Sequence, residues 1–195
     1  MSPGAPALLA VFVWLSSPEV LGAVLLAALC HELGHYAALR RRGGWVRAVR
    51  ISALGAEMQV EGRMSYGGEL LAAAAGPAVN LLLAAALGLL GRWWEPLYLL
   101  AGAQAVLGCF NLLPILPLDG GRMLWLALCW GTDPFLADRV TQAVSLAAAG
   151  LLTVAGAALA RRSPFLLWTA AALLVCAAAP CIKRRRSVYA SHKGR

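Results

Sequence analysis

The chain has 195 residues, of which 61% are hydrophobic and only 13% are charged, and its mean hydropathy is +0.71. Soluble domains are about 45–50% apolar, so this composition excludes an ordinary soluble enzyme. The formal net charge of +8 does not indicate a nucleic-acid partner, because the basic residues gather in 40–50 and 183–195, directly after apolar runs. That placement is typical of the cytoplasmic flanks of membrane helices, where basic side chains meet anionic lipid. We therefore expect an integral membrane protein that binds no nucleic acid.

Six apolar blocks follow one another along the chain. They cover about 5–16, 19–40, 68–91, 97–118, 135–160 and 164–180. Because about 20 helical residues cross a bilayer, blocks two to five are long enough to span it, whereas the first and last are short. The pattern predicts an all-α polytopic membrane protein with about six transmembrane helices. We expect a single intramembrane domain over residues 1–182, followed by a basic cytoplasmic tail over 183–195.

Residues 45–64, "WVRAVRISALGAEMQVEGRM", interrupt the helical pattern. Apolar and polar residues alternate there around a Leu-Gly break, which predicts a short β-hairpin at the membrane surface between the second and third helices. An irregular interfacial loop is the alternative. The basic residues before this segment and in the tail predict that both termini are cytoplasmic and that the second helix runs inward. Arg161 and Arg162, in a loop that should then be external, conflict mildly with this topology.

The second block carries the motif His31-Glu32-x-x-His35. Residues four apart lie on one face of a helix, one turn apart, so two imidazoles can bind one metal ion while Glu32 acts as a general base. This arrangement is that of zinc proteases. Ionisable groups within a membrane cost at least about 2.5–3.5 kcal/mol each on insertion scales and usually mark function. Two alternatives stay open: pairing of these groups without a metal, and metal binding without catalysis.

Two histidines leave a catalytic zinc ion short of one protein ligand. His192 lies in the basic tail, and Asp133 and Asp138 flank the start of the fifth block. The better candidate is Asp119, in "NLLPILPLDGG" (111–121), whose prolines and glycines exclude a continuous helix. Non-helical backbone inside a membrane is tolerated where protein or water surrounds it, so we expect an unwound segment that brings Asp119 to the histidines. A turn at the membrane surface is the simpler alternative.

The third block contains "AAGPAVN", residues 74–80. Gly76 and Pro77 permit the close approach of a neighbouring helix. Asn80 requires a hydrogen-bond partner in dry surroundings. Helix packing is the simpler interpretation of this motif, and a supporting role beside the metal ligands is the alternative.

In this order, "HELGH", "AAGPAVN" and "NLLPILPLDGG" resemble the site-2 protease family of intramembrane zinc metalloproteases, peptidase family M50. The resemblance spans about residues 20–125. It is to the branch that releases a membrane-tethered pro-sigma factor during bacterial sporulation. We expect neither the PDZ insertion nor the CBS domain that occur in parts of this family. This departure affects the expected substrate and its regulation more than the expected reaction.

The resemblance implies a role for a small set of residues. These are the Zn²⁺ ligands His31, His35 and Asp119, the catalytic base Glu32, and the substrate-positioning residue Asn111, with Asn80 and Gly120 as further candidates for positioning or support. The family also has a β-element between the motif helix and the next helix, where this chain has residues 45–64.

The predicted function is that of a metalloendopeptidase, which hydrolyses a peptide bond in or near a transmembrane segment of a membrane-tethered protein. We expect a multi-pass protein of the bacterial cell membrane with its active site toward the cytoplasm. Expected partners are that protein substrate, membrane lipid and an inhibitory membrane protein. The alternative is a membrane metal transporter or sensor. A transporter should have a polar path through several helices, whereas blocks five and six hold few polar residues, among them Thr141, Gln142 and Ser145.

Overall fold

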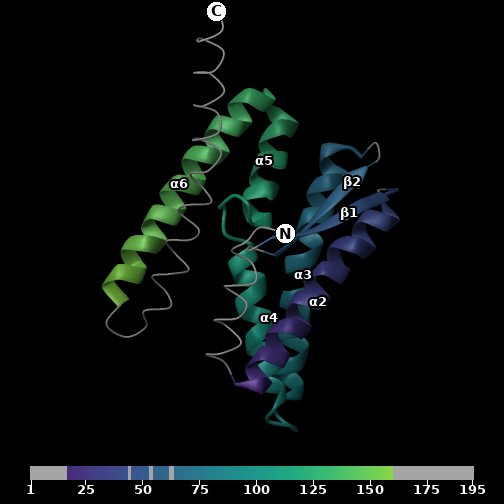
Figure 1. Ribbon diagram of the computed structural model, residues 1–195, viewed down its shortest axis with the longest axis vertical. Coiled ribbons are helices and arrows are strands. Elements are labelled where there is room, and N and C mark those ends of the chain that lie inside the picture. Colours follow the sequence, from purple (N-terminus) through teal and green to yellow (C-terminus); the bar gives the residue numbers. More distant parts are fainter. Residues whose placement is uncertain (1–16, 44, 53–54, 62–63, 160–195) are drawn as a thin grey trace, which may run out of the picture. The chain divides into compact units, whose positions relative to one another are not determined.

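The computed structural model describes residues 17–43, 45–52, 55–61 and 64–159, and this part of the chain is mostly helical (Figure 1). Two compact units divide the chain between Leu112 and Leu113. The first holds α2 (Pro18–Arg41), β1 (Trp45–Ser52), β2 (Gly55–Glu61), α3 (Tyr66–Leu90) and α4 (Leu97–Asn111), and the second holds α5 (Asp119–Gly131) and α6 (Pro134–Leu159). The first and sixth apolar blocks and the basic tail lie outside the described residues. The predicted boundary between domain and tail therefore stays a prediction.

Serine caps define where α2 and α3 begin. The Ser17 hydroxyl accepts a hydrogen bond from Val20 N at 3.4 Å, and Pro18 occupies the first helical position, where its missing N–H costs nothing. The Ser65 hydroxyl accepts in the same way from Gly68 N at 3.2 Å. Each helix consequently begins one or two residues before the apolar block that predicts it.

Small residues let α2 and α3 pack closely in the first unit. A β-carbon built at Gly34 would lie 2.9 Å from Ala75 O and 3.2 Å from the α-carbon of Gly76. α4 lies beside α3 in a similar way, since a β-carbon at Gly108 would lie 3.0 Å from that of Asn80. Contacts this tight replace the hydrophobic driving force that helices lack in lipid. Apart from Leu39, the buried core residues along these helices are correspondingly small: Ala23, Ala27, Ala72, Ala73 and Ala101.

The strands β1 and β2 pair antiparallel, with Trp45 opposite Glu61 and Ser52 opposite Gly55. They follow α2, and β1 lies against that helix (Figure 1). The two strands occupy most of the segment for which the sequence predicts a hairpin. The location of this segment at a membrane surface stays a prediction.

The chain between α4 and α5 differs from its predicted form. The fourth apolar block extends to residue 118, yet α4 ends at Asn111 because Pro114 and Pro117 lack the N–H that a continuing helix needs. A helix then begins at Asp119, where the sequence predicts unwound chain. An acidic residue in the first turn is favourable there, because it faces the positive end of the helix dipole. α5 has 13 residues, which is too short to cross a membrane alone.

Two polar side chains, one before α6 and one within it, make hydrogen bonds in the second unit. Just before this helix, Asp133 Oδ2 accepts from Phe135 N at 2.9 Å and so caps the start of α6. Three turns further on, Ser145 Oγ accepts from Leu116 N at 3.0 Å and donates to Pro114 O at 3.3 Å. The non-helical segment before α5 is thus fixed by a side chain from α6.

Three of the described helices are long and apolar enough to cross a membrane. They are α2, α3 and the part of α6 from Pro134 to Ala155. α4 is apolar but shorter. The predicted total of six spans stays a prediction.

Candidate metal centre

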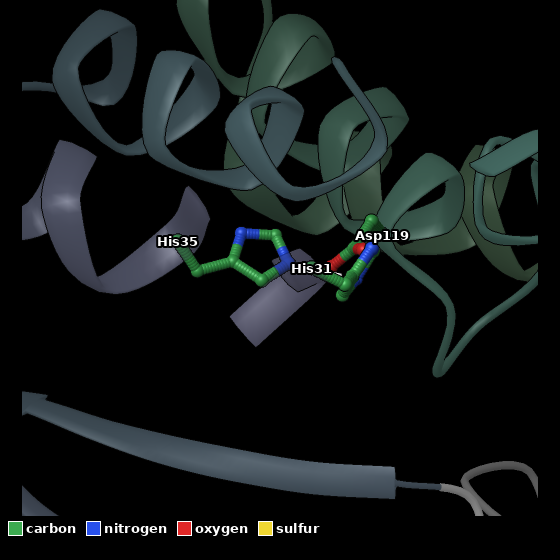
Figure 2. Close-up of side chains that lie close together, drawn as sticks. All are labelled: His31, His35 and Asp119. Carbon is green, nitrogen blue, oxygen red and sulfur yellow. Dashed lines mark hydrogen bonds between the residues drawn. The ribbon is translucent and has the colours of Figure 1, made fainter. Parts of the chain in front are cut away.

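The two histidines of α2 are held by hydrogen bonds to α3. His31 Nδ1 donates to Asn80 Oδ1 at 2.6 Å, and His35 Nδ1 donates to the backbone oxygen of Ala72 at 2.8 Å. The ring planes stand at 86° with their centroids 4.6 Å apart. Figure 2 shows both side chains on α2, with the ring of His35 turned toward His31. His31 is buried, with 5% of its surface exposed.

These bonds determine which ring nitrogens carry a hydrogen. A neutral imidazole has one N–H and one lone pair, so rings that donate from Nδ1 keep a lone pair on Nε2. The two Nε2 atoms lie 3.1 Å apart. Two lone pairs at this separation repel one another unless a proton or a metal ion lies between them. Zinc–imidazole bonds of about 2.0–2.1 Å at a tetrahedral angle place two nitrogens about 3.3 Å apart, so the pair fits a shared zinc ion.

Gly76 of α3 borders the ligating atoms. A β-carbon at this position would overlap His35 Nε2 and would lie 2.9 Å from His31 Cε1. Any larger residue at position 76 would therefore displace the rings that the hydrogen bonds orient. The motif "AAGPAVN" thus supplies both the open space beside the imidazoles, at Gly76, and a hydrogen-bond partner for His31, at Asn80.

A residue that the sequence analysis did not select lies behind Asn80. Gln104 of α4 is 2% exposed, and its Oε1 accepts from Asn80 Nδ2 at 2.5 Å. Asn80 Nδ2 also donates to the backbone oxygen of Ala27 at 3.1 Å. The signal for Gln104 is its isolation, because it is the one strongly polar side chain in an otherwise apolar run before Asn111. Its partner could not be known before α3 and α4 were placed side by side.

The other predicted site residues occupy three helices. Glu32 is half-buried on α2, next to His31. Asn111 is the last residue of α4, and its Nδ2 donates to Leu107 O at 3.1 Å. In the second unit Asp119 is the first residue of α5 and half-buried, and Gly120 is buried (Figure 2 labels Asp119).

The first unit brings together His31, His35 and Asn80 by hydrogen bonds and ring contacts. The two histidines and Asp119 each offer one ligand atom of a kind that zinc binds. Catalytic zinc sites typically use three protein ligands and keep a fourth position for water or substrate.

Comparisons with known proteins point to a family of zinc proteases. A sequence model described as Peptidase family M50 matches residues 89–155, which include Asn111 and Asp119. A Mycobacterium tuberculosis protein named "Putative zinc metalloprotease Rip3" is 37% identical over 139 residues. A Synechocystis protein, "Putative zinc metalloprotease sll0528", is 31% identical over 165 residues.

The chain is a member of peptidase family M50. The predicted family is therefore confirmed. The names of these relatives describe zinc metalloproteases, which agrees with the predicted enzyme class, a zinc-dependent metalloendopeptidase.

A solved structure shows the same fold. The site-2 protease from Methanocaldococcus jannaschii matches with a TM-score of 0.70 and 20% identity, over 89% of this chain and 84% of that one. The chain is thus a mostly helical membrane protein, as the sequence predicts.

The sequence relatives are longer than this chain. The alignment covers 59% of this chain but 32% of the Mycobacterium protein, and 71% of this chain but 42% of the Synechocystis protein. The chain thus spans less than half the length of the M50 relatives it matches. The activities and substrates of those longer proteins can therefore only be proposed for this chain.

Proposed function

We propose that the chain is a zinc-dependent metalloendopeptidase that hydrolyses a peptide bond in or near a transmembrane segment of a membrane-tethered protein. The observation that carries the proposal is the pair of Nε2 atoms 3.1 Å apart, on rings whose Nδ1 atoms both donate elsewhere. They lie on α2, a helix long and apolar enough to span a membrane, with Glu32 beside His31.

His31, His35 and Asp119 are the proposed zinc ligands. Two neutral imidazoles and one carboxylate make up the three protein ligands that catalytic zinc sites use. Bound zinc supplies a Lewis acid, which activates water near neutral pH and polarises a carbonyl oxygen. Membership of the M50 family supports the assignment, since the matched stretch includes Asp119.

Glu32 is the proposed general base. Its carboxylate would take the proton of the attacking water and deliver it to the leaving amine nitrogen, as one group can in both halves of a hydrolysis. Asn111 is proposed to donate to the scissile carbonyl oxygen. Its Nδ2 carries two hydrogens, and the bond to Leu107 O uses one of them. Gly120, buried in the first turn of α5, is proposed to leave room beside Asp119.

The proposed orientation places the motif toward the cytoplasm of a bacterial cell, in a multi-pass protein with both termini cytoplasmic. Within the first unit, the C-terminal end of α2 carries the exposed residues Arg40, Arg41 and Arg42. The C-terminal end of the antiparallel helix α3 leads into a turn with exposed Trp93 and Trp94. Basic residues favour the cytoplasmic side, where they meet lipid headgroups, and tryptophans favour the interface, which supports this orientation.

The proposed partners are a membrane-tethered substrate and an inhibitory membrane protein, and the narrower proposal for the substrate is a pro-sigma factor of sporulation. The test is co-expression with a library of single-span and hairpin-tethered substrates that includes a membrane-tethered sigma factor. The intact chain should cleave at least one member. Glu32→Gln should keep its zinc by elemental analysis and lose cleavage by about 10²–10⁴-fold.

Glu19→Gln is the matched control, because Glu19 lies in the exposed first turn of the same helix. It should cleave at the parental rate. Zinc-loaded Glu32→Gln that cleaves as fast as the parent would contradict the mechanism. Vesicles that transport zinc while no substrate is cut would favour the transporter instead.

A further inference from the structure

Gln104 stands out among the described residues as a buried polar side chain outside the motifs of the metal centre. It lies in α4, "LYLLAGAQAVLGCFN", and is 2% exposed. A buried amide costs free energy unless it is hydrogen-bonded. A glutamine without a partner would therefore destabilise a helix that packs through small apolar residues. The hydrogen bond from Asn80 at 2.5 Å accounts for its presence.

Asn80 has a side-chain orientation that its partners determine. Both hydrogens of Nδ2 are donated, one to Ala27 O at 3.1 Å and one to Gln104 Oε1 at 2.5 Å. Both acceptors are oxygens, so the amide nitrogen must face them and Oδ1 must face His31 Nδ1. A carbonyl oxygen accepts only, and His31 therefore holds its hydrogen on Nδ1 and its lone pair on Nε2.

We infer that Gln104 is a positioning residue of the metal centre: it orients the Asn80 amide and so keeps His31 in the ring form that can bind zinc through Nε2. This inference rests on the proposed function. Gln104 makes the shorter of the two bonds that hold the Asn80 nitrogen. Without it, one buried Asn80 hydrogen has no acceptor, Ala27 O alone holds the nitrogen, and the amide can more easily turn its nitrogen toward His31. The ring would then carry its hydrogen on Nε2 and could not ligate.

The first test replaces Gln104 in the full chain, purified in detergent, with zinc affinity measured by competition against a chromogenic chelator. Gln104→Met keeps the length of the side chain and removes the acceptor, and the zinc dissociation constant should rise about 10–100-fold, as for other partners of zinc ligands. Gln104→Glu restores an acceptor for Asn80 and should recover most of the affinity. The visible spectrum of the Co²⁺-substituted protein should change in Gln104→Met and return toward the parental form in Gln104→Glu.

Gln142→Met on α6 is the matched control. The Gln142 side chain has a buried Nε2 with no hydrogen-bond partner among the described residues, so the same substitution there removes an amide without breaking such a bond. Its zinc affinity should equal that of the parent. Gln104→Met with parental zinc affinity and cobalt spectrum would overturn the inference.

A second test uses Asn80→Asp to separate orientation from packing. A carboxylate presents an oxygen to His31 whichever way it turns, so in this background Gln104 has no orientation left to impose. Adding Gln104→Met should then lower zinc affinity little. A loss as large as in the parental background would mean that Gln104 acts through packing, and it would overturn the inference. Folding is checked by helical circular dichroism. If Gln104→Met fails to fold in both the parental and the Asn80→Asp background, Gln104 is needed for folding itself and the inference is wrong.

Failure of the inference and failure of the proposed function are distinguishable. A parental chain that binds no zinc contradicts both. A parental chain that binds zinc and cleaves its substrate, together with an unaffected Gln104→Met, contradicts only the role of Gln104.

Discussion

The first unit orients its proposed ligands by direct hydrogen bonds to their rings, whereas the second positions Asp119 through the chain that precedes it. His31 and His35 are oriented by an amide and a carbonyl group from α3, and Gln104 of α4 extends this network. The segment before Asp119 is shaped by prolines and by close contact with a glycine.

The second unit relies on close backbone contacts in addition to hydrogen bonds. A β-carbon at Gly121 would lie 2.6 Å from Ile115 C and Leu116 N. Leu116 N in turn donates to Ser145 Oγ, so α5 and α6 both contact the backbone at Ile115 and Leu116. Steric contacts and two hydrogen bonds thus determine how α5 begins. The histidines should therefore be sensitive to loss of hydrogen-bonding groups, and both units to added bulk where a glycine makes room.

Gly76→Ala should have the largest effect, and it tests whether the first unit also depends on shape. The added carbon would overlap His35 Nε2 and crowd His31, so both rings must leave the geometry that their bonds impose. Displacement of this size in an active site costs about 10²-fold in rate, and zinc affinity should fall with it. The measurements are substrate cleavage during co-expression and zinc content after purification.

Gly88→Ala is the control for that change, because it lies in the same helix with nothing within 4 Å of the added carbon. It should leave zinc content and cleavage unchanged. Parental zinc binding by Gly76→Ala would show that the rings have more freedom than their hydrogen bonds indicate.

Gly121→Ala should destabilise the second unit by about 1–3 kcal/mol, the usual cost of forcing extra atoms into a packed site. The atoms that the new carbon meets belong to the backbone of Ile115 and Leu116, which cannot rotate away. Thermal unfolding in detergent measures the loss, and the start of α5 should shift enough to slow cleavage. Gly131→Ala, at the far end of the same helix and with open space around it, should be neutral. Equal unfolding temperatures for the two variants would contradict the tight contact.

The contrast between the two units also explains which parts of the molecule were predictable from sequence. α2, α3 and α6 match their apolar blocks closely, because hydrophobic length and cap residues are local properties. The His-Glu-x-x-His spacing is local too, since one helical turn is enough to pair the rings. The identity of the family followed from such local motifs.

Features that depend on contacts between elements were not predictable. α5 begins with Asp-Gly-Gly, a sequence typical of turns, and it is helical where Gly121 packs on the preceding backbone. Gln104 and Ser145 were visible as polar residues in apolar blocks, but their partners come from 24 and 29 residues away. No periodicity in a single sequence identifies such partners.

Ser145→Ala tests the hydrogen-bonded part of the second unit. The change removes the acceptor of Leu116 N and the donor to Pro114 O, and it leaves a backbone N–H unpaired. We expect a loss of about 1–2 kcal/mol in the free energy of unfolding, with less effect on zinc content than Gly76→Ala. Urea or thermal unfolding in detergent measures the difference. Ser145→Thr keeps the hydroxyl and should recover part of the stability; if Ser145→Ala is as stable as the parent, the hydroxyl does not hold the segment.

Thr141→Val should have the smallest effect and the opposite sign. Thr141 is fully buried one turn before Ser145, and its hydroxyl has no hydrogen-bond partner in the described part of the chain. Valine has nearly the same shape without the unpaired hydroxyl, so the variant should gain about 1 kcal/mol in stability. Thr153→Val on the same helix is the contrast, because the Thr153 hydroxyl donates to Ala149 O at 2.8 Å and its removal offers no such gain. A destabilised Thr141→Val would mean that this hydroxyl is bonded after all, and the second unit would then rely on polar side chains as much as the first.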